Sequence, residues 1–293
     1  MDLTSFAAEV GHDGPVGIVG LSTRGGALPG ARCVNAPSGM EWIQADEMTA
    51  CCGAGTAIDE LSAALRAVGQ RTVLPDGGTV GGALAAGCSG IRRLGDGPLR
   101  DVLLQAKYVA ATGEVVKAGG PTVKNVSGFD VCRLLVGSRG TLGFLGEVIL
   151  RTRPLAQHSE WFTATADDPG PVFAALHRPV SVLWDGSTIW ALLEGHADDV
   201  VEQASVAGLF GAAGPPTMPG GTRHLIAPSA ILSLPDSVDG AVFIAEVGIG
   251  VVHLAEPSAL PAAASSSSLT QLQRRIKSQF DPTGRLNPGV VVG

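Results

Sequence analysis

The chain has 293 residues, of which 45% are hydrophobic and 16% are charged, and its formal net charge is -7 at pH 7. This composition is typical of a compact globular protein with room for two lobes, and it argues against disorder. Because neutralising phosphates requires clustered Lys and Arg, and the basic clusters here are short, we expect no nucleic-acid partner.

The five cysteines include an adjacent pair but form neither a CxxC motif nor a Cys/His spacing suited to a metal. This pattern favours reduced thiols in a cytoplasm over a disulfide framework, and we expect no metal site. Cys88 is interpreted as a small buried residue, with a reactive thiol as the alternative. Because no run of eighteen apolar residues occurs, we expect a cytoplasmic protein that meets the inner face of a membrane only through partners.

The first ninety residues predict the order strand, loop, strand, helix, strand, loop. Pro15–Val19 is expected to be a short strand, with the loop Gly20–Gly26 behind it. A second strand is expected at Thr49–Cys52 and a third at Thr72–Leu74.

The helix between these strands carries start and stop signals. Thr56 is expected to cap it, and Asp59 stands three residues later as in a capping box. Gly69 is expected to end it. One face carries the apolar residues Leu61, Leu65 and Val68.

The stretch Pro75–Gly90, PDGGTVGGALAAGCSG, is the richest in glycine, and Thr79 opens a short predicted helix over Val80–Ala86. Glycine lets a ligand lie directly on the backbone, and a helix start carries unpaired N–H groups with a partial positive charge. The stretch therefore suits an anionic group such as a nucleotide pyrophosphate. A glycine-rich turn in a core of small residues is the alternative interpretation.

Residues Val102–Val116 predict two strands joined by a turn at Thr112–Gly113, because β-branched residues flank the Thr-Gly pair. The end of Gly137–Leu150 predicts a further strand, which Pro154 terminates. Glycine becomes less frequent after this point. We therefore expect a first domain at residues 1–155.

Residues 156–265 are expected to form a reduced second lobe with strands such as Ile189–Leu193 and Val242–Val247. Residues 266–293 are expected to form an amphipathic helix and a turn-rich tail, because apolar residues recur every four positions. The apolar positions are Leu272, Ile276 and Phe280, and the basic residues expected on the water-facing side are Arg274, Arg275 and Lys277.

Two common phosphate motifs are excluded, because the chain has no GxxxxGK[ST] and no GxGxxG that follows a first strand. Instead, four glycine-rich loops lie next to predicted strands. They are residues 20–26, 53–56, 77–90 and 137–143. A ligand held by several loops at once must be long.

These loops carry a specific resemblance. The ordered segments GLSTRGGALPG, GAGTAIDEL, PDGGTVGGALAAGCSGIRRLGDGPLRD, KNVSGFDVCRLLVGSRGTLGFLGEVIL and FDPTGRLNPG resemble the FAD-binding flavoproteins of the vanillyl-alcohol-oxidase type, the PCMH-type family. Within it they are most similar to the FAD-binding subunits of glycolate oxidases (GlcE-like). The resemblance covers residues 15–154 and 270–290, and it is weak between them.

The resemblance implies an α+β fold. It consists of a two-subdomain FAD domain with the FAD extended between the subdomains, a small α+β substrate or cap lobe, and a C-terminal helix that returns to the FAD domain. Many relatives attach FAD through a histidine beside the first loop. Because Gly20–Gly30 has none, FAD is expected to be non-covalent.

The resemblance also implies which residues bind the cofactor. One side of the pyrophosphate would be wrapped by Gly20, Leu21, Ser22, Thr23 and Arg24. The other side would be held by Pro75, Gly77, Gly78, Thr79, Val80, Gly81, Gly82, Gly87, Ser89 and Gly90. A larger residue at Gly81 or Gly82 is expected to weaken FAD binding more than folding.

Further cofactor contacts are implied elsewhere in the chain. Arg93 would pair with phosphate, unless it simply solvates a loop. The other positions are Lys124, Asn125, Gly128 and Asp130 near the flavin, Val148 on the adenine side and Asn287 in the tail. Phe129 replaces the tyrosine usual in the family motif, which leaves that position without a hydroxyl.

The second lobe offers one candidate catalytic residue. Val247–Leu254 resembles the end of the GDGNLH motif of D-2-hydroxy-acid dehydrogenases, in which paired histidines and an acid bind a metal. Here the upstream histidine would fall at Ala245 or Glu246, so a metal site is incomplete. His253 is a candidate general base for a 2-hydroxy acid, with a histidine buried in a strand as the alternative.

Three functions remain open at this stage. The first is the FAD-binding subunit of a glycolate- or D-lactate-oxidising complex, with a larger flavin-containing sister subunit and an iron–sulfur subunit as partners. The second is a self-sufficient small FAD oxidoreductase for another alcohol or hydroxy acid. The third is a non-catalytic FAD-binding assembly subunit.

Overall fold

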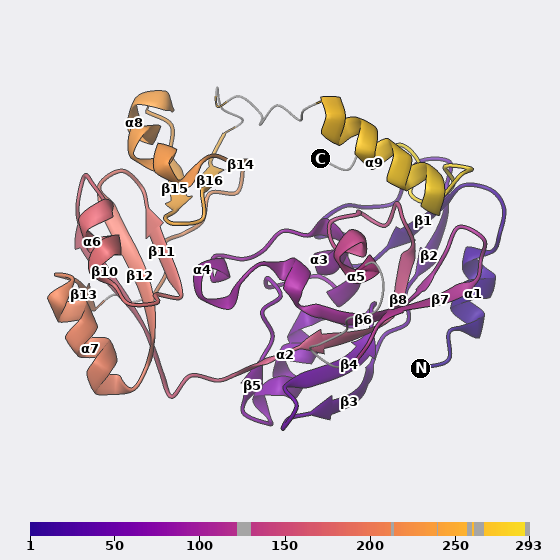
Figure 1. Cartoon of the computed structure of the whole chain (residues 1–293), viewed down its shortest axis with the longest axis horizontal. Coiled ribbons are helices and arrows are strands. Elements are labelled where there is room, and N and C mark those ends of the chain that lie inside the picture. Colours follow the sequence, from indigo (N-terminus) through magenta and orange to yellow (C-terminus); the bar gives the residue numbers. More distant parts are fainter. Residues whose placement is uncertain (122–129, 212–213, 239, 257–259, 261–266, 291–293) are drawn as a thin grey trace. The chain divides into compact units, whose positions relative to one another are not determined.

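Figure 1 shows the computed structural model, which describes residues 1–121, 130–211, 214–238, 240–256, 260 and 267–290. Helices and sheets are mixed along the chain, as the α+β prediction requires. The chain divides into two compact units. The first comprises Met1–Gly90, Pro98–Leu155 and Ser265–Gly293, and the second comprises Ile91–Gly97 and Ala156–Ala264. The short segment Ile91–Gly97 thus groups with the second unit.

The main sheet of the first unit has five antiparallel strands in the order β3-β4-β8-β6-β7. They are β3 (Met40–Gln44), β4 (Thr49–Gly53), β6 (Leu103–Val109), β7 (Val115–Gly119) and β8 (Phe144–Arg151). The central strand β8 is buried from Phe144 to Leu150. The predicted strands in these regions and the turn at Gly113 are confirmed.

Three helices of the first unit contribute to its main core, namely α2 (Ile58–Arg66), α3 (Val80–Ala86) and α5 (Val131–Leu135). A smaller core forms where α1 (Thr4–Val10) packs on the parallel pair β1 (Val16–Val19) and β2 (Arg32–Asn35). The remaining elements are β5 (Gln70–Arg71), η1 (Leu99–Asp101), β9 (Arg153–Pro154) and α9 (Ser267–Phe280).

The expected capping box of α2 is wrong. The helix begins after Ala57 without a side-chain cap, because the Thr56 hydroxyl instead accepts the Gly39 N–H at 2.9 Å. Leu61 and Leu65 are buried as predicted, whereas Val68 follows the helix end and is 44% exposed.

The strand expected at Thr72–Leu74 is also wrong. The Leu74 N–H donates to the Thr72 hydroxyl at 3.1 Å, which closes a local turn and removes this donor from strand pairing. The strand in this region ends directly before Thr72, where Gln70–Arg71 pairs with Arg153–Pro154.

The helix α9 forms where it is expected, but its faces differ in part from the prediction. Ile276 and Phe280 pack against the main core, whereas Leu272 is 51% exposed. Lys277 was expected to face water, yet its ammonium is half-buried and donates to the Thr141 carbonyl at 2.7 Å. The cause is a buried partner, the carboxylate of Asp281.

The second unit contains a seven-stranded sheet in the order β13-β10-β12-β11-β15-β16-β14, all pairs antiparallel. The strands are β10 (His158–Thr165), β11 (Ser181–Trp184), β12 (Thr188–Gly195), β13 (Phe210–Gly211), β14 (Thr222–Leu225), β15 (Phe243–Glu246) and β16 (Val251–Leu254). Its helices are α4 (Arg93–Asp96), α6 (Gly170–Ala175), α7 (Ala197–Val206), η2 (Pro228–Ser233) and α8 (Leu234–Ser237). The strands predicted around Ile189–Leu193 and Val242–Val247 are confirmed as β12 and β15.

The two faces of this second sheet differ in chemistry. One face supplies the apolar core, in which Trp184 meets Phe243 edge-on with ring centroids 5.8 Å apart. The opposite face carries Arg223, Glu246 and His253, because Arg223 and Ile244 both pair with His253 and Glu246 lies two residues after Ile244. Polar groups are thus gathered on one face by strand register.

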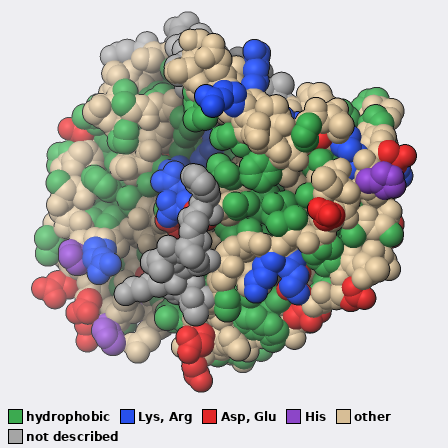
Figure 2. All heavy atoms as spheres, turned by 45° about the vertical axis from the view of Figure 1, so that its right-hand side comes forward, with side chains coloured by type: hydrophobic (Ala, Val, Ile, Leu, Met, Phe, Trp, Pro, Cys, Tyr) green, Lys and Arg blue, Asp and Glu red, His purple; other side chains and the backbone are tan. Residues whose placement is uncertain are grey.

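The cysteines differ in how deeply they are buried. Cys51, Cys52 and Cys132 are buried, and burial raises the pKa of Cys52 to about 12, which keeps it a thiol. Cys88 is exposed, so its expected burial is wrong. None of the described helices has both the length and the apolarity needed to cross a bilayer. On the face in Figure 2, acidic and basic side chains are scattered among apolar and uncharged ones.

Candidate functional site

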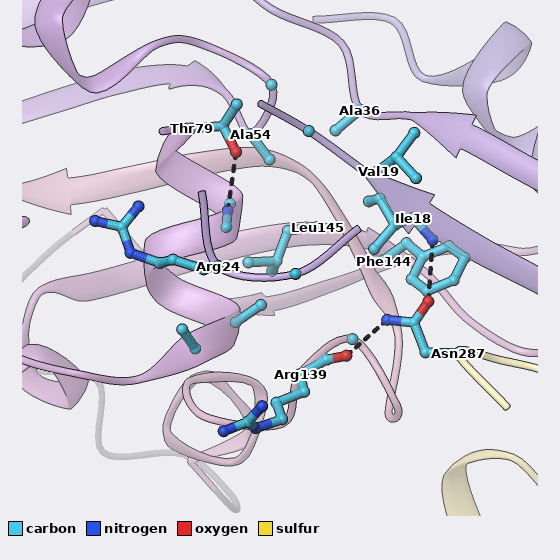
Figure 3. Close-up of a pocket in the computed structure, with 18 of the residues that line it drawn as sticks. Ile18, Val19, Arg24, Ala36, Ala54, Thr79, Arg139, Phe144, Leu145 and Asn287 are labelled. Atoms are coloured by element: carbon cyan, nitrogen blue, oxygen red, sulfur yellow. Dashed lines mark hydrogen bonds between the residues drawn. The ribbon is translucent and has the colours of Figure 1, made fainter. Parts of the chain in front are cut away.

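A cavity of about 210 Å³ opens in the first unit, and Figure 3 shows it in close-up. It is lined by parts of all four predicted glycine-rich loops, by the end of β1, by α3 and by the C-terminal tail. The loop residues are Gly20, Leu21, Ser22, Thr23, Arg24, Gly25 and Gly26, then Ala54 and Gly55, then Thr79, Gly81 and Gly82, then Ser138, Arg139, Gly140 and Gly143. The structure therefore brings the four loops to one place.

The short helix α3 is the element that joins the loops. Thr79 caps it as predicted, accepting the Gly82 N–H at 3.1 Å. The Val80 N–H donates to Thr56 O at 2.9 Å and the Gly81 N–H to Ala54 O at 2.7 Å. The N–H groups at the start of α3 are therefore satisfied by the second loop and by the Thr79 cap. The expectation of unpaired donors at this helix start is wrong, because they anchor the loop instead of a ligand.

The other end of α3 holds the fourth loop. The N–H of Gly137 donates to Leu84 O at 2.9 Å, and the N–H of Arg139 donates to Ala85 O at 2.8 Å. A Cβ at Gly87, whose φ is +68°, would lie 2.6 Å from the Gly137 Cα. Gly87 is therefore required for the close approach of these two segments.

Free donors for an anion lie in the first loop and in the turn before α3. Within the described residues, the backbone N–H groups of Leu21–Gly26 and Gly77–Thr79 donate no hydrogen bond. Successive free N–H groups in a turn form a concavity that attracts anions. The predicted phosphate role of Gly20–Arg24 has a physical basis in these donors.

Two arginines add positive charge to the lining. The Arg24 guanidinium donates to the carbonyls of Gly77 at 2.7 Å and Asp76 at 2.9 Å, which ties the first loop to the third. The Arg139 guanidinium makes no hydrogen bond or ion pair with a described residue and is exposed. In Figure 3 both side chains extend toward the left of the view. No carboxylate is among the described residues that line the cavity, so none of these residues neutralises the positive charge.

The glycines show where the cavity has room. A Cβ at Gly26 would meet no atom within 4 Å, and one at Gly82 would meet only the Thr79 hydroxyl at 3.0 Å. By contrast, a Cβ at Gly81 would lie 2.9 Å from both the Cβ and the carbonyl oxygen of Ala54. A larger residue at Gly81 would contact Ala54, which argues against the expectation that it affects binding more than folding. Gly26 and Gly82 therefore leave open space in the cavity that an added side chain would fill.

Several other predicted residues lie outside the lining. They are Pro75, Gly77, Gly78, Val80, Gly87, Ser89, Gly90, Arg93, Asp130 and Val148. The Ser89 hydroxyl accepts the Leu99 N–H at 3.1 Å, and Arg93 belongs to α4 of the second unit. A Cβ at Gly78 would lie 2.3 Å from the Thr23 hydroxyl oxygen, so this glycine lets the first and third loops approach.

The predicted residues near the flavin and adenine are placed as follows. Asp130 is exposed and caps α5, accepting the Arg133 N–H at 3.2 Å. Val148 is fully buried in β8, between its strand partners Cys52 and Ala106. Lys124, Asn125 and Gly128 lie outside the described residues.

The sequence did not single out Ala54, Gly55, Ser138, Arg139, Gly140 or Gly143 as site residues, although it identified their loops. Arg139 has φ +50°, a conformation that no residue-type signal announces. The glycine density of residues 137–143 is the one signal that could have found this wall of the cavity.

A second polar cluster lies on the sheet of the second unit. The Nε2 of His253 is 2.8 Å from the Oε1 of Glu246, whose side chain is only 2% exposed. The other carboxylate oxygen of Glu246, as well as the Nε and Nη2 of Arg223, is buried without a hydrogen-bond partner. Within the described residues, no group of three or more His, Cys, Asp and Glu side chains is arranged to hold a metal.

Comparison with known proteins identifies the cofactor of the first site. Residues 19–119 match the protein family described as FAD binding domain. These residues therefore form an FAD-binding domain. The fold of the chain is shared with alkyldihydroxyacetonephosphate synthase over 94% of this chain and 73% of that one, with a TM-score of 0.66 and 15% sequence identity. The cofactor and the fold class predicted from the sequence are thereby confirmed.

Relatives of this FAD-binding domain occur in several enzymes. The chain is 36% identical to a D-lactate dehydrogenase of Archaeoglobus fulgidus, over 38% of this chain and 26% of that protein. It is 37% identical to the glycolate oxidase subunit GlcE of Escherichia coli, over 34% of this chain and 30% of that protein. These two relatives are named as a dehydrogenase and an oxidase subunit. The match spans only about a third or less of each relative.

The residues of the cavity fit FAD. A pyrophosphate needs donors and positive charge, which the free N–H groups of the first loop, Arg24 and Arg139 provide. The open space over Gly26 and Gly82 admits a group that lies against the backbone. Both features belong to the same lining.

Proposed function

We propose that this chain is the FAD-binding subunit of a complex that oxidises a small 2-hydroxy acid such as glycolate or D-lactate. The FAD-binding domain supplies the redox group, and relatives that share it are named as D-lactate dehydrogenases and glycolate oxidase subunits. The substrate class is supported by the polar cluster of the second unit, which consists of Arg223, Glu246 and His253.

The observation that carries the proposal is a pair of unpaired nitrogens in the guanidinium of Arg223. Its Nε and Nη2 are buried and have no partner among the described residues. An unpaired buried charged donor is costly, by about 1–3 kcal/mol or more, so such groups in native proteins call for a ligand, an ion or a water. A carboxylate matches the planar fork of a guanidinium and satisfies two donors at once. A 2-hydroxy acid carries that carboxylate.

The neighbouring histidine can take the hydroxyl proton of such a substrate. Because the carboxylate of Glu246 accepts a hydrogen bond from Nε2, that nitrogen of His253 carries the proton. The other nitrogen, Nδ1, then presents a lone pair, and it makes no hydrogen bond with a described residue. In this arrangement Glu246 fixes the tautomer and His253 acts as the general base.

Oxidation to the 2-oxo acid removes two electrons and two protons from the substrate. FAD, when bound, would supply the two-electron acceptor for the hydride from the alcohol carbon. His253 takes the hydroxyl proton at Nδ1, and Arg223 holds the carboxylate in place. The product is the 2-oxo acid, which retains the carboxylate of the substrate.

The proposed partners are a larger flavin-containing sister subunit and an iron–sulfur subunit, through which the electrons would leave. The names of two relatives support this part of the proposal, since GlcE of Escherichia coli and GlcD of Bacillus subtilis are both described as glycolate oxidase subunits. The cysteine spacing of this chain does not match the usual iron–sulfur motifs, so the cluster would come from another chain.

The test is anaerobic reduction of the bound flavin, followed by its absorbance. The chain is purified with FAD, alone and together with its co-purifying partners, and mixed with glycolate or D-lactate. We expect bleaching in the presence of the partners. Bleaching by the chain alone would instead support a self-sufficient oxidoreductase, and no bleaching in either preparation would contradict the proposal and leave an assembly subunit. Acid denaturation should release the flavin if FAD is non-covalent.

Matched variants locate the substrate site. Arg223→Met and His253→Gln should each slow reduction on the order of 100-fold, since each removes a charge-assisted or proton-accepting contact. His224→Gln is the control, because His224 neighbours Arg223 on β14 but contacts the Thr222 hydroxyl at 3.0 Å. Unchanged reduction by the Arg223 and His253 variants would remove the cluster from the mechanism.

A further inference from the structure

Asn287 in the C-terminal tail joins two walls of the FAD cavity through one side-chain amide. Its Oδ1 accepts the Ile18 N–H at 3.0 Å, and its Nδ2 donates to the Arg139 carbonyl at 2.6 Å, as Figure 3 shows. Ile18 lies in β1, two residues before the loop Gly20–Gly26. Arg139 lies in the fourth loop. The amide therefore links the phosphate-binding loop of one wall to the arginine-bearing loop of the other.

The backbone around this amide is adapted to it. Asn287 has φ +44° and Arg139 has φ +50°, both in the left-handed region that residues other than glycine rarely adopt. A Cβ at Gly140 would lie 2.6 Å from the Asn287 Nδ2. Such conformations persist where the surrounding contacts over-determine them, and they gather at ligand sites. The left-handed backbone of Asn287 and Arg139 and the missing side chain at Gly140 together make room for the amide at this position.

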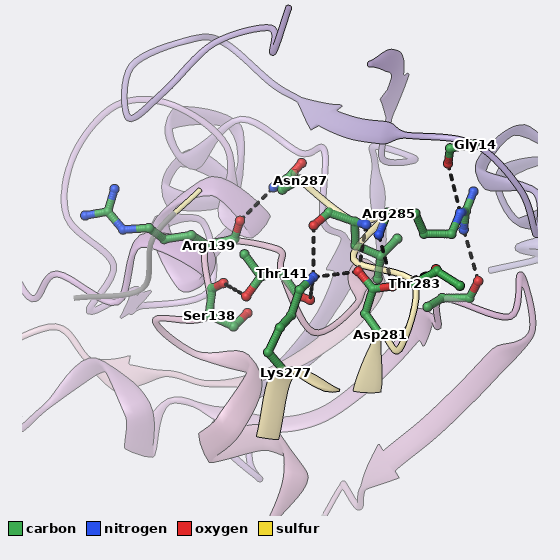
Figure 4. Close-up of polar contacts among 11 residues, drawn as sticks. Gly14, Ser138, Arg139, Thr141, Lys277, Asp281, Thr283, Arg285 and Asn287 are labelled. Atoms are coloured by element: carbon green, nitrogen blue, oxygen red, sulfur yellow. Dashed lines mark hydrogen bonds and ion pairs between the residues drawn. The ribbon is translucent and has the colours of Figure 1, made fainter. Parts of the chain in front are cut away.

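The tail that carries Asn287 is anchored by residues Lys277–Asn287, which we call the clasp. Figure 4 shows its polar contacts. The Lys277 ammonium donates to Thr141 O at 2.7 Å, which adds a second link to the fourth loop. The Asn287 N–H donates to Val16 O at 2.9 Å, and the Val16 N–H to Arg285 O at 3.0 Å, so the clasp pairs with β1. Both walls of the cavity are therefore held by the same segment.

We propose that Asn287 is a positioning residue for FAD and that docking of the clasp and binding of FAD are coupled. Both side-chain bonds of Asn287 go to the protein, so its contribution is to hold the first and fourth loops at one separation. Coupling between two binding events is reciprocal, so bound FAD must stabilise the docked clasp as much as the clasp strengthens FAD binding. The proposal rests on FAD binding alone and involves neither substrate nor partner subunits.

The test compares Asn287→Gly with Arg285→Lys in the full chain. Glycine adopts φ +44° without strain, so the first variant removes the amide and keeps the backbone. Arg285 is the matched control, because its guanidinium anchors the same clasp to the carbonyls of Val10 and Gly14, which do not line the cavity. The dissociation constant of FAD is measured by quenching of flavin fluorescence, and the stability of the FAD-free chain by urea unfolding.

We expect Asn287→Gly to raise the FAD dissociation constant at least about tenfold, because it removes both bonds of the amide. Arg285→Lys keeps these bonds and leaves the clasp docked in nearly all molecules, so it should change the constant by less than about threefold although it lowers stability. An equal rise in both variants would mean that FAD loss merely follows destabilisation, and it would overturn the proposal. So would an unchanged constant in Asn287→Gly. Failure of glycolate and D-lactate to reduce the flavin leaves these outcomes unaffected.

A wild-type measurement tests the same coupling if the glycine variant does not fold. The Ile18 amide donates to the Asn287 side chain, and the Val16 amide donates to the clasp backbone. By reciprocity, saturating FAD should slow hydrogen exchange of both amides at least about tenfold. Exchange rates that FAD leaves unchanged would contradict the coupling.

Discussion

Two arginines with buried donors, Arg285 in the C-terminal clasp and Arg223 in the second sheet, have opposite surroundings. The guanidinium of Arg285 donates to the carbonyls of Val10, Gly11, Asp13, Gly14 and Ala111. Two buried nitrogens of Arg223 donate to nothing described. Arg285 has its hydrogen-bond partners inside the fold, so its role is structural. Arg223 has donors left over, which is the property expected of a binding residue.

The largest effect is expected at Arg285. Arg285→Met leaves the carbonyls that it serves without a donor, so the free energy of unfolding should fall by about 3–5 kcal/mol, a large fraction of the usual total. The measurement is the urea midpoint of the FAD-free chain. A loss below about 1 kcal/mol would show that water replaces the guanidinium and that the contrast with Arg223 has no energetic basis.

The same contrast between filled and open surroundings separates two glycines of the cavity. Gly81→Val drives a side chain into Ala54, so it should lower the free energy of unfolding by about 1–3 kcal/mol. Gly26→Val meets open space, so it should change stability by less than about 0.5 kcal/mol while it raises the FAD dissociation constant about tenfold or more. Urea unfolding and flavin fluorescence measure the two quantities. If Gly81→Val mainly weakened FAD binding and Gly26→Val mainly lowered stability, the ligand would lie against Gly81 instead.

Local chemistry explains which parts of the site the sequence could predict. The Thr79 cap and the helix Val80–Ala86 follow from short-range signals and are confirmed. Glycine density identified all four loops that line the cavity. The sequence could not show that Val80 and Gly81 donate to residues about 25 positions earlier, so it predicted free donors where the structure has none.

Long-range contacts explain what the sequence missed. The position of Arg139 depends on Asn287, 148 residues later, and the surroundings of Arg223 depend on the pairing of β14 with β16. Neither contact leaves a periodic or compositional trace. Lys277 was expected on the water-facing side because a helical pattern alone cannot show that a buried carboxylate, Asp281, stands four residues later as its partner.

A smaller effect on stability is expected from the carboxylate of Asp281, which, like Arg285, has hydrogen-bond partners inside the fold. Burial alone would raise the pKa of Asp281, but hydrogen bonds from Lys277, Leu286 and Arg285 outweigh it and hold the pKa below the usual value of 3.8. A lowered folded pKa adds stability above the unfolded value, and this stability is lost as the pH falls through the folded pKa. The free energy of unfolding should therefore decrease as the pH drops below about 4.

Asp281→Asn should flatten this acid dependence, because the amide does not titrate. Asp130→Asn is the control, since Asp130 is exposed and caps only the short helix α5. Urea unfolding of the three proteins between about pH 3 and pH 7 measures the slopes. Equal slopes in the wild type and in Asp281→Asn would show that other carboxylates account for the acid sensitivity.

Little or no loss of stability is expected at Arg223, although two of its nitrogens are buried. Arg223→Met removes donors that have no partner and replaces them with an apolar side chain of similar length, so the free energy of unfolding should fall by less than about 1 kcal/mol or rise. The same variant should lose flavin reduction by a 2-hydroxy acid. Urea unfolding beside Arg285→Met gives the comparison directly. A loss as large as that of Arg285→Met would mean that Arg223 is already satisfied inside the fold, and the carboxylate site would lose its main support.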